Sequence, residues 1–306
     1  MNNRSSAPAG LELSGVSFAY SPAHPVLDAL SFKVRRGEIY ALLGRNGAGK
    51  TTCLELIEGL RGAHAGSCRL FGDLSPRHRE ARRRVGVMFQ DPAVPGDLTP
   101  PEALALFGEA SGRMDDAARA VRSADLGSRT RVRAADLSGG ERRRLDFAIA
   151  AWGAPDLLIL DEPTNGMDLD SRDWLWGEVR RARDAGCAVL ATTHYLEEAR
   201  ANADRIGILR KGMIAAEGSY DQLAQDRGVQ VRFRLSGPVD SSWGEADLDG
   251  AHGLRTTDVH RTVTGLVDEI RRAGVRLVDL EATRTSLHDL ILGPSGRDLD
   301  EEVAAR

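Results

Sequence analysis

One stretch, GRNGAGKTT at residues 44–52, constrains the fold of this chain more than any other. It fits the spacing G-x-x-x-x-G-K-[ST], with an apolar run at 38–43 before it and a helical pattern at 50–60 after it. In such a strand–loop–helix unit, glycines let backbone N–H groups turn toward a phosphate, a lysine supplies a cation and a hydroxyl can bind Mg²⁺. The sequence therefore predicts a triphosphate site rather than an incidental glycine turn. The matching residues are Gly44, Gly49, Lys50 and Thr51.

A pair of carboxylates after another apolar run extends this prediction. Asp161 and Glu162 follow the run at 157–160. Adjacent residues at a strand end point in different directions. Asp161 is therefore predicted to hold the metal, and Glu162 to face the space beyond the γ-phosphate, where a water must be activated. Without the glycine loop upstream, the same pair would be typical of a solvated turn.

A second glycine pair, in LSGGE at residues 137–141, has no lysine beside it. Ser138 and Glu141 fit the capping box S-x-x-E, so the stretch by itself could be a helix start and nothing more. Its role depends on the other motifs.

The pattern of apolar residues predicts an α/β fold. Alternation over 11–20 and 30–34 indicates antiparallel strands with one covered face. Three short apolar runs separated by helical segments indicate buried parallel strands with crossover helices. Ser75 and Pro76 are predicted to begin a helix, as cap and first helical residue. The three runs are 157–160, 188–191 and 205–209.

Changes in composition along the chain predict its division into domains. The main domain is expected over 11–220, with a helical insertion at about 91–152, and a small α+β appendage over 221–293. Residues 1–10 are expected to be disordered, and 294–306 to form a frayed, acidic tail.

Charge and cysteine content exclude some classes of function. The formal net charge is -4, and the basic residues are almost all arginine. This balance provides no field to attract nucleic acid, so no nucleic-acid partner is expected. The arginine triplets at 82–84 and 142–144 spread around a helix and are predicted to be solvated or salt-bridged. The cysteines lack paired spacing, which indicates reduced thiols in cytoplasm; they are Cys53, Cys68 and Cys187.

No run approaches the ~20 apolar residues that a membrane span needs, and the first twenty residues lack a signal-peptide pattern. If the chain acts on a membrane, another chain is expected to cross it.

Together, the motifs resemble those of the nucleotide-binding subunits of ABC transporters, in that family's order, over roughly residues 11–220. GRNGAGKT resembles the Walker A loop, LSGGE the signature and LLILDE the Walker B strand. The family's Q-loop, D-loop and switch histidine are matched by Gln90, Asp168 and His194. Tyr20 stands where the family places the aromatic residue that stacks on adenine. Taken singly, His194 could be a satisfied histidine after a strand, and Tyr20 could be ordinary strand packing.

The resemblance implies the family's fold, a P-loop ABC ATPase core with an antiparallel β subdomain and a helical insertion. It also implies ATP as substrate, Mg²⁺ as cofactor and in-line attack of water on the γ-phosphate. Glu162 would polarise the water, His194 would contact the γ-phosphate, and Gln90 would sense metal and water. The implied metal ligands are Thr51, Gln90 and Asp161. The implied nucleotide contacts are Tyr20, Gly44, Asn46, Gly47, Gly49, Lys50, Thr51, Thr52, Ser138, Gly139, Gly140 and Asp168.

The family's dimer explains the second glycine pair. Two subunits pair head to tail, so that the signature of one chain closes over the γ-phosphate bound by the other. A homodimer is expected, although pairing with a different ATPase stays open. The other implied partner is a separate integral membrane permease, which would place the chain on the inner face of the cell membrane.

The segment at 285–301, TSLHDLILGPSGRDLDE, resembles the C-terminal ending of ATPases that serve two-component exporters. It favours export of a drug, antibiotic, lipid or polysaccharide over import. Two alternatives stay open at this point. A non-transport ABC-type ATPase acting on nucleic acid or ribosomes would usually carry coiled-coil or zinc insertions or a second cassette, and a monomeric P-loop kinase would leave LSGGE unused.

Overall fold

The computed structural model describes residues 9–22, 24–225, 229–236, 251–256 and 258–284. Contacts divide the chain into two units, residues 1–220 and 221–306, which are described separately. Residues 1–8, the tail at 294–306 and the exporter-like segment at 285–301 lie outside the described residues.

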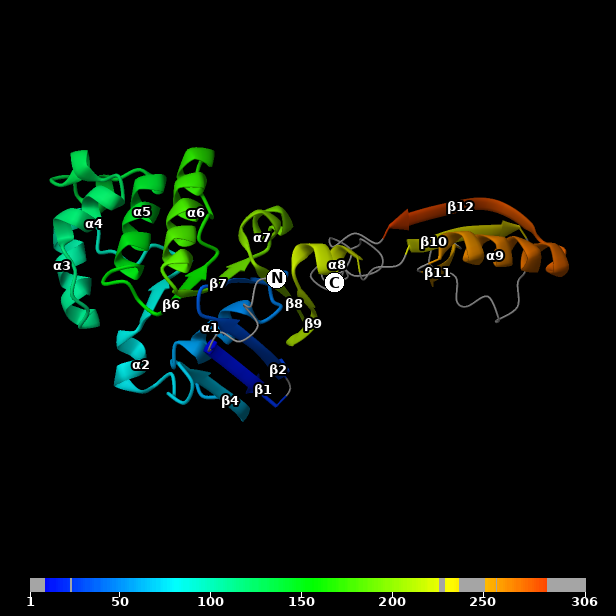
Figure 1. Cartoon of the computed structure of the whole chain (residues 1–306), viewed down its shortest axis with the longest axis horizontal. Coiled ribbons are helices and arrows are strands. Elements are labelled where there is room, and N and C mark those ends of the chain that lie inside the picture. Colours follow the sequence, from blue (N-terminus) through cyan, green and yellow to red (C-terminus); the bar gives the residue numbers. More distant parts are fainter. Residues whose placement is uncertain (1–8, 23, 226–228, 237–250, 257, 285–306) are drawn as a thin grey trace. The chain divides into compact units, whose positions relative to one another are not determined.

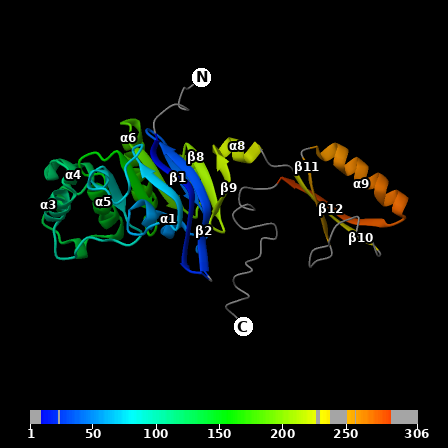
Figure 2. The same ribbon diagram turned by 90° about the horizontal axis from the view of Figure 1, so that it is seen from below.

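Three antiparallel strands form one layer of the first unit, in the order β2-β1-β4. Alternate residues of β1, such as Leu11 and Leu13, are buried, while their neighbours are more exposed. The predicted alternation is confirmed. Figure 2 shows β1 and β2 as a layer beside strands β8 and β9. The strands are β1 Ala9–Ser21, β2 His24–Arg35 and β4 Ala65–Leu70.

A six-stranded sheet forms the centre of the first unit, in the order β5-β6-β7-β3-β8-β9. All neighbouring pairs are parallel except β8 and β9. Every residue of β3, β6 and β7 is buried, as expected for strands covered on both faces. Strand β9 was not predicted. The strands are β3 Ile39–Leu43, β5 Val85–Met88, β6 Leu157–Asp161, β7 Ala188–Thr193, β8 Arg205–Arg210 and β9 Met213–Gly218.

Helices cover both faces of this sheet. Leu54 and Ile57 of α1 pack in one core with the antiparallel layer and with Tyr40 of β3. Leu175 and Val179 of α6 pack in a second core on the other face. The helices of the first unit outside its helical region are α1 Lys50–Ile57, α2 Arg79–Arg83, α6 Leu169–Asp184 and α7 Leu196–Asn202. Helix α8 Tyr220–Gln225 falls almost wholly in the second unit.

The helix predicted at Ser75–Pro76 begins instead at Arg79, with His78 as its N-cap. The Ser75 carbonyl accepts from the His78 N–H at 2.9 Å, so Ser75 closes a single turn before the helix. That prediction was wrong because Ser75 and Pro76 belong to a local turn that precedes the helix.

A helical region lies at one end of the first unit, with α3, α4 and α5 side by side (Figure 1). It has its own core, which includes Leu104, Val121, Leu145 and Trp152. The predicted capping box at Thr99 is present at the start of α3. The helices are α3 Pro100–Ser111, α4 Ala117–Ser123 and α5 Gly139–Ala150, with short 3₁₀ turns at Gly127–Arg129 and Ala134–Asp136.

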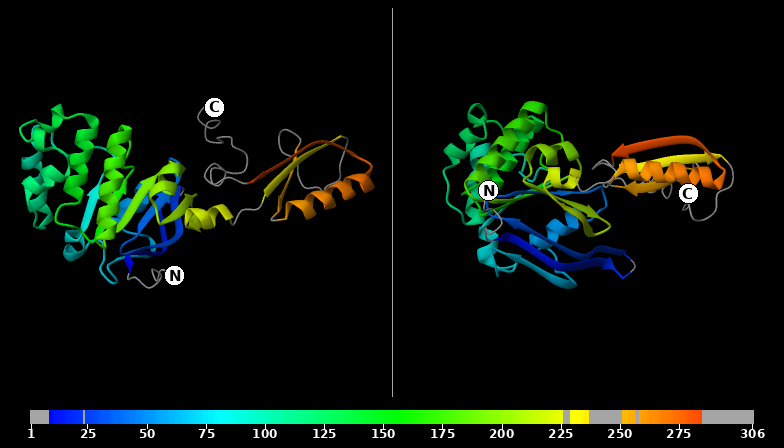
Figure 3. Two further views of the ribbon diagram at one scale, coloured as in Figure 1. Left: turned by 45° about the horizontal axis from the view of Figure 1, so that its top comes forward. Right: turned by 45° about the vertical axis from the view of Figure 1, so that its right-hand side comes forward.

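The second unit is an antiparallel three-stranded sheet, in the order β11-β10-β12, with one helix along it (Figure 3). Val231 and Phe233 of β10 pack against Leu266 and Ile270 of α9. The unit is α+β, as predicted. Its elements are β10 Val229–Ser236, β11 His252–Thr256, α9 Val259–Ala273 and β12 Arg276–Arg284.

Candidate nucleotide site

The loop between β3 and α1 forms the floor of the candidate site. Gly47 and Gly49 have φ angles of 80° and 104°, in the left-handed region that favours glycine. A Cβ at Gly49 would lie 2.8 Å from Leu27 Cδ2 and 3.2 Å from the Val26 carbonyl oxygen, so a larger residue would be crowded as well as strained there. The first N–H groups of α1 have no intrahelical carbonyl partner, which makes this helix end suitable for an anion.

Lys50, the first residue of α1, is buried at 6% exposure. Its Nζ donates to the carbonyls of Gly44 at 2.8 Å and Arg45 at 3.3 Å. The same Nζ lies 3.4 Å from Glu162 Oε1. The ammonium group is therefore held at the loop, between the phosphate cradle and the carboxylate.

Glu162 directly follows β6 and has a left-handed φ of 41°, rare for a residue with a side chain. Its N–H donates to Thr192 Oγ1 at 2.9 Å, and its Oε2 accepts from Asn165 Nδ2 at 2.8 Å. His194 Nδ1 lies 3.2 Å from its Oε1, although not aligned for a hydrogen bond. Groups on three sides thus fix the direction of this carboxylate.

Asp161, the residue before Glu162, points elsewhere. Its Oδ1 accepts from Thr192 Oγ1 at 2.5 Å, so one threonine contacts both acidic residues. Burial raises the pKa of Asp161, and the charge of Glu162 adds to this effect. Hydroxyl, amide and carboxylate oxygens suit Mg²⁺, which binds through few protein ligands and substrate phosphates. Thr51, Gln90 and Asp161 are residues of these types.

Tyr20 lies at the edge of the site, 55% exposed. Its hydroxyl contacts Thr52 Oγ1 at 3.1 Å and donates to Glu55 Oε2 at 3.2 Å. The Arg61 guanidinium lies over the ring, 4.8 Å from its centroid. These contacts orient an exposed aromatic ring, which is suited to stacking on a base.

One pocket of about 670 Å³ brings most of the predicted residues together. Those that line it are Tyr20, Asn46, Gly47, Gly49, Lys50, Thr51, Thr52, Gln90, Glu162 and His194. Sequence reasoning missed four other lining residues, Val26, Arg45, Asn165 and Tyr195. Asn165 could have been predicted as a site residue, since it stands three residues after Glu162 in the loop that follows the same strand.

The remaining predicted residues do not line this pocket; they are Gly44, Asp161, Ser138, Gly139, Gly140 and Asp168. Ser138 is exposed and caps α5, with the reciprocal bonds of a capping box to Glu141. A Cβ at Gly140 would lie 2.6 Å from Ser171 Oγ, so this glycine allows α5 to pack on α6. Asp168 caps α6 through the Ser171 N–H. The signature is thus a well-formed helix start outside its own chain's pocket.

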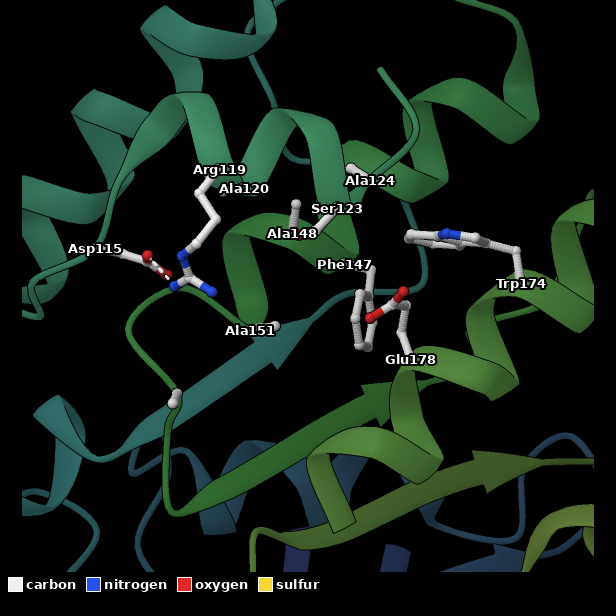
Figure 4. A pocket seen from close by; sticks show the side chains of 11 residues that line it. Asp115, Arg119, Ala120, Ser123, Ala124, Phe147, Ala148, Ala151, Trp174 and Glu178 are labelled. Atoms are coloured by element: carbon white, nitrogen blue, oxygen red, sulfur yellow. Dashed lines mark hydrogen bonds and ion pairs between the residues drawn. The ribbon is translucent and has the colours of Figure 1, made fainter. Parts of the chain in front are cut away.

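A smaller pocket of about 160 Å³ lies in the helical region, among α4, α5 and α6 (Figure 4). Phe147 and Trp174 form one side, and the ion pair of Asp115 with Arg119 lies on the other. None of the predicted site residues lines it. The larger pocket is therefore the candidate nucleotide site.

The second arginine triplet departs from its prediction. Arg142 and Arg144 are partly exposed, but Arg143 is buried at 4% exposure. The expectation of a solvated residue is wrong at Arg143, because its guanidinium is surrounded by backbone carbonyls, with the Asp146 carboxylate at 3.8 Å. Local sequence cannot show this, since those carbonyls belong to other segments.

Known proteins resemble this chain over nearly its whole length. It is 35% identical over 300 residues to the daunorubicin/doxorubicin resistance ATP-binding protein DrrA of Streptomyces peucetius, across 94% of this chain and 90% of the relative. The chain belongs to the ABC transporter family. The family's sequence profile matches residues 27–165.

Two further comparisons agree. The chain is 42% identical over 220 residues to the Nod factor export ATP-binding protein I of Burkholderia lata, which covers 70% of this chain and 72% of that one. A solved structure of the ATP binding subunit of an ABC transporter matches with a TM-score of 0.64 and 30% identity, over 70% of this chain and 92% of that one. This ABC protein is therefore an ATPase that drives transmembrane transport, and the non-transport alternative is not favoured. No helix among the described residues is both long and apolar enough to span a bilayer.

Proposed function

We propose that this chain is the ATP-hydrolysing subunit of an exporter and works as a head-to-tail homodimer on a separate membrane permease. The printed functions of its relatives support export of a drug, antibiotic, lipid or polysaccharide, since they include drug resistance and Nod factor export. The observation that carries the proposal is the Glu162 carboxylate, held by Lys50, Asn165 and His194 beside the glycine loop.

In this proposal each side chain of the pocket has one task. Tyr20 stacks on adenine, and the loop at 44–49 with α1 receives the phosphates. Lys50 exchanges its contacts to the Gly44 and Arg45 carbonyls for β- and γ-phosphate oxygens. Glu162 orients the attacking water and accepts its proton, and His194 contacts the γ-phosphate.

Thr51, Gln90 and Asp161 would hold Mg²⁺, with Gln90 also linking to the permease. The bound cation supplies charge stabilisation to the transferring phosphoryl group. The protein's own part is to provide oxygen ligands and to keep Glu162 directed at the water.

A second copy would complete the site. Ser138, Gly139 and Gly140 of that copy would offer the positive end of α5 to the γ-phosphate, and its Asp168 would lie at the interface. The chain would then be cytoplasmic and peripheral on the inner face of the membrane. The exposure of Ser138 and its position outside its own pocket support this arrangement.

Glu162→Gln tests the proposal. It should lower turnover by about 10²-fold or more while ATP still binds, because only the proton acceptor is lost. With ATP, the variant should elute as a dimer in size-exclusion chromatography. The matched control is Glu197→Gln, at a carboxylate 79% exposed on α7, which should behave as wild type. A variant that hydrolyses ATP normally, or stays monomeric with ATP at high concentration, would contradict the proposal.

A further inference from the structure

The guanidinium of Arg143 joins three stretches of the nucleotide site that are far apart in the sequence. Arg143 lies on α5, one turn after the signature glycines, and is 4% exposed. Its Nη1 donates to the Phe89 and Gln90 carbonyls at 2.7 and 3.1 Å. Its Nη2 donates to the Glu162 and Pro163 carbonyls at 3.2 and 3.0 Å, and its Nε to Pro163 at 3.2 Å. One side chain thus ties the signature helix to both the Q-loop and the water-activating residue.

The surroundings require an arginine rather than any cation. Burial lowers the pKa of Arg143, so its charge must be met by acceptors. These are carbonyls on two segments, with the Asp146 carboxylate more distant, at 3.8 Å. A guanidinium has five N–H donors in a rigid fork, whereas a lysine has three donors at one point. Lysine could reach one of the segments but could not bridge them.

The bridge made by Arg143 matters most at the backbone of Glu162. Its left-handed φ of 41° is a conformation that persists only when the surroundings fix it. Thr192 holds its N–H, and Arg143 holds its carbonyl. Since φ and ψ set the direction of the side chain, these two bonds aim the carboxylate.

We propose that Arg143 is a positioning residue for ATP hydrolysis: it fixes the Glu162 and Gln90 backbones to the signature helix. Arg143 does not line the nucleotide pocket, so it acts through these two residues. This inference rests on the proposed roles of Glu162 and Gln90. It implies that Arg143 supports turnover far more than ATP binding.

Steady-state hydrolysis and ATP affinity of Arg143→Lys and Arg143→Gln provide the test. Both variants should lower kcat by about 10- to 100-fold, because small displacements of a catalytic group have effects of this size. The Kd for ATP should stay within about twofold, since the glycine loop and Lys50 are unchanged. Arg142→Lys is the matched control. Among the residues that the structure describes, the Arg142 side chain donates only to the Ala134 carbonyl, which a lysine can also reach, so the kcat of this variant should not change.

A double mutant separates positioning from general support of the fold. On the Glu162→Gln background, Arg143→Lys should cause a clearly smaller further loss of turnover than on the wild-type background, because one of the two residues it positions is already disabled. Additive losses, a wild-type kcat in both Arg143 variants, or a loss of ATP binding parallel to the loss of kcat would each overturn the inference.

The single Glu162→Gln variant tells the two proposals apart. If it hydrolyses ATP as wild type does, the proposed function fails, whatever the Arg143 variants do. If it is inactive while both Arg143 variants have normal kcat, only the positioning role fails.

Discussion

The two glycine loops of this chain both lead into helices, but the helices begin differently, α1 after a left-handed Gly49 and α5 with a capping box at Ser138, and the surroundings of the two loops differ as well. The loop at 44–49 opens into a pocket that also holds Lys50, Glu162 and His194. The loop at 137–141 starts a capped helix whose N-cap, Ser138, is exposed and lines no part of that pocket. In the proposed function, the first loop forms a site within one chain, and the second is half of a site that needs another chain. A glycine pair before a helix therefore does not define a site by itself, because the surroundings decide its role.

Of the substitutions that compare the two loops, Ser138→Arg should have the largest effect on turnover. A bulky cation at the start of α5 would block the partner's γ-phosphate, and turnover should fall by about 10²- to 10³-fold, as when an electrostatic donor is removed from a transition state. Binding of ATP to a single chain should not change. Hydrolysis assays and equilibrium nucleotide binding measure the two effects.

The control for this variant is Ser128→Arg, at another exposed serine of the helical region. Normal turnover in Ser138→Arg would show that the signature is only a helix start, as in the monomeric kinase alternative.

Lys50→Ala should show the opposite pattern and weaken binding itself. Hydrogen bonds to charged groups contribute about 1.5–3 kcal/mol, so ATP affinity should fall by about 10- to 100-fold. Lys33→Ala removes a solvent-exposed lysine that pairs with Glu12 at 2.8 Å, and it should leave affinity unchanged. Titration calorimetry compares them. Equal affinities would place the phosphates outside the loop at 44–49.

Tyr20→Ala should have a smaller effect on the same pocket. Loss of aromatic stacking corresponds to about 0.5–1.5 kcal/mol, or about a 2- to 12-fold weaker affinity. Tyr20→Phe keeps the ring and loses only the hydroxyl contacts to Thr52 and Glu55, so it should bind nearly as wild type. If the two variants bind ATP equally weakly, the hydroxyl rather than the ring is the important group.

The smallest expected effect concerns Glu58, and it changes the stability of the folded chain rather than the hydrolysis of ATP. Burial and the charge of Asp161 raise the pKa of this residue, at the end of α1, to about 7 from an ordinary value of 4.5. The folded state therefore binds more protons than the unfolded state between these values, and stability falls as pH rises from about 4.5 to 7.

Glu58→Gln should remove this loss, because glutamine stays neutral. From pH 5 to pH 8 the melting temperature of wild type should fall by about 1–3 °C more than that of the variant. Calorimetry at the two pH values is the measurement, and Glu197→Gln is the exposed control. If the melting temperatures of wild type and Glu58→Gln change equally with pH, the pKa of Glu58 is not raised by burial and by Asp161 at the end of β6.

Sequence reasoning succeeded where a contact is local. The capping boxes at Thr99 and Ser138 depend on residues three positions apart, and both are present. Strands β6 and β7 are buried throughout because both faces are covered, so their apolar runs at 157–160 and 188–191 were recognisable. Strand β9 was missed because Met213–Gly218 begins with four consecutive apolar residues, so its sequence does not show the alternation that its burial has.

Within the site, the sequence alone indicated which residues carry the chemistry, because phosphate loops and strand-end carboxylates are encoded by spacing along the chain. It could not place Thr192 between Asp161 and Glu162, nor bury Arg143 among the carbonyls of two distant segments.

What the sequence determined by itself was thus the α/β class, the triphosphate loop and the identity of the acidic pair, each set by short-range backbone geometry. The tertiary structure decided how those groups are held. It determined which carboxylate pairs with Lys50, which arginine is buried, and which glycine loop lines the pocket. The physical reason is that burial and hydrogen-bond partners arise from strands and helices that meet only after the chain has folded.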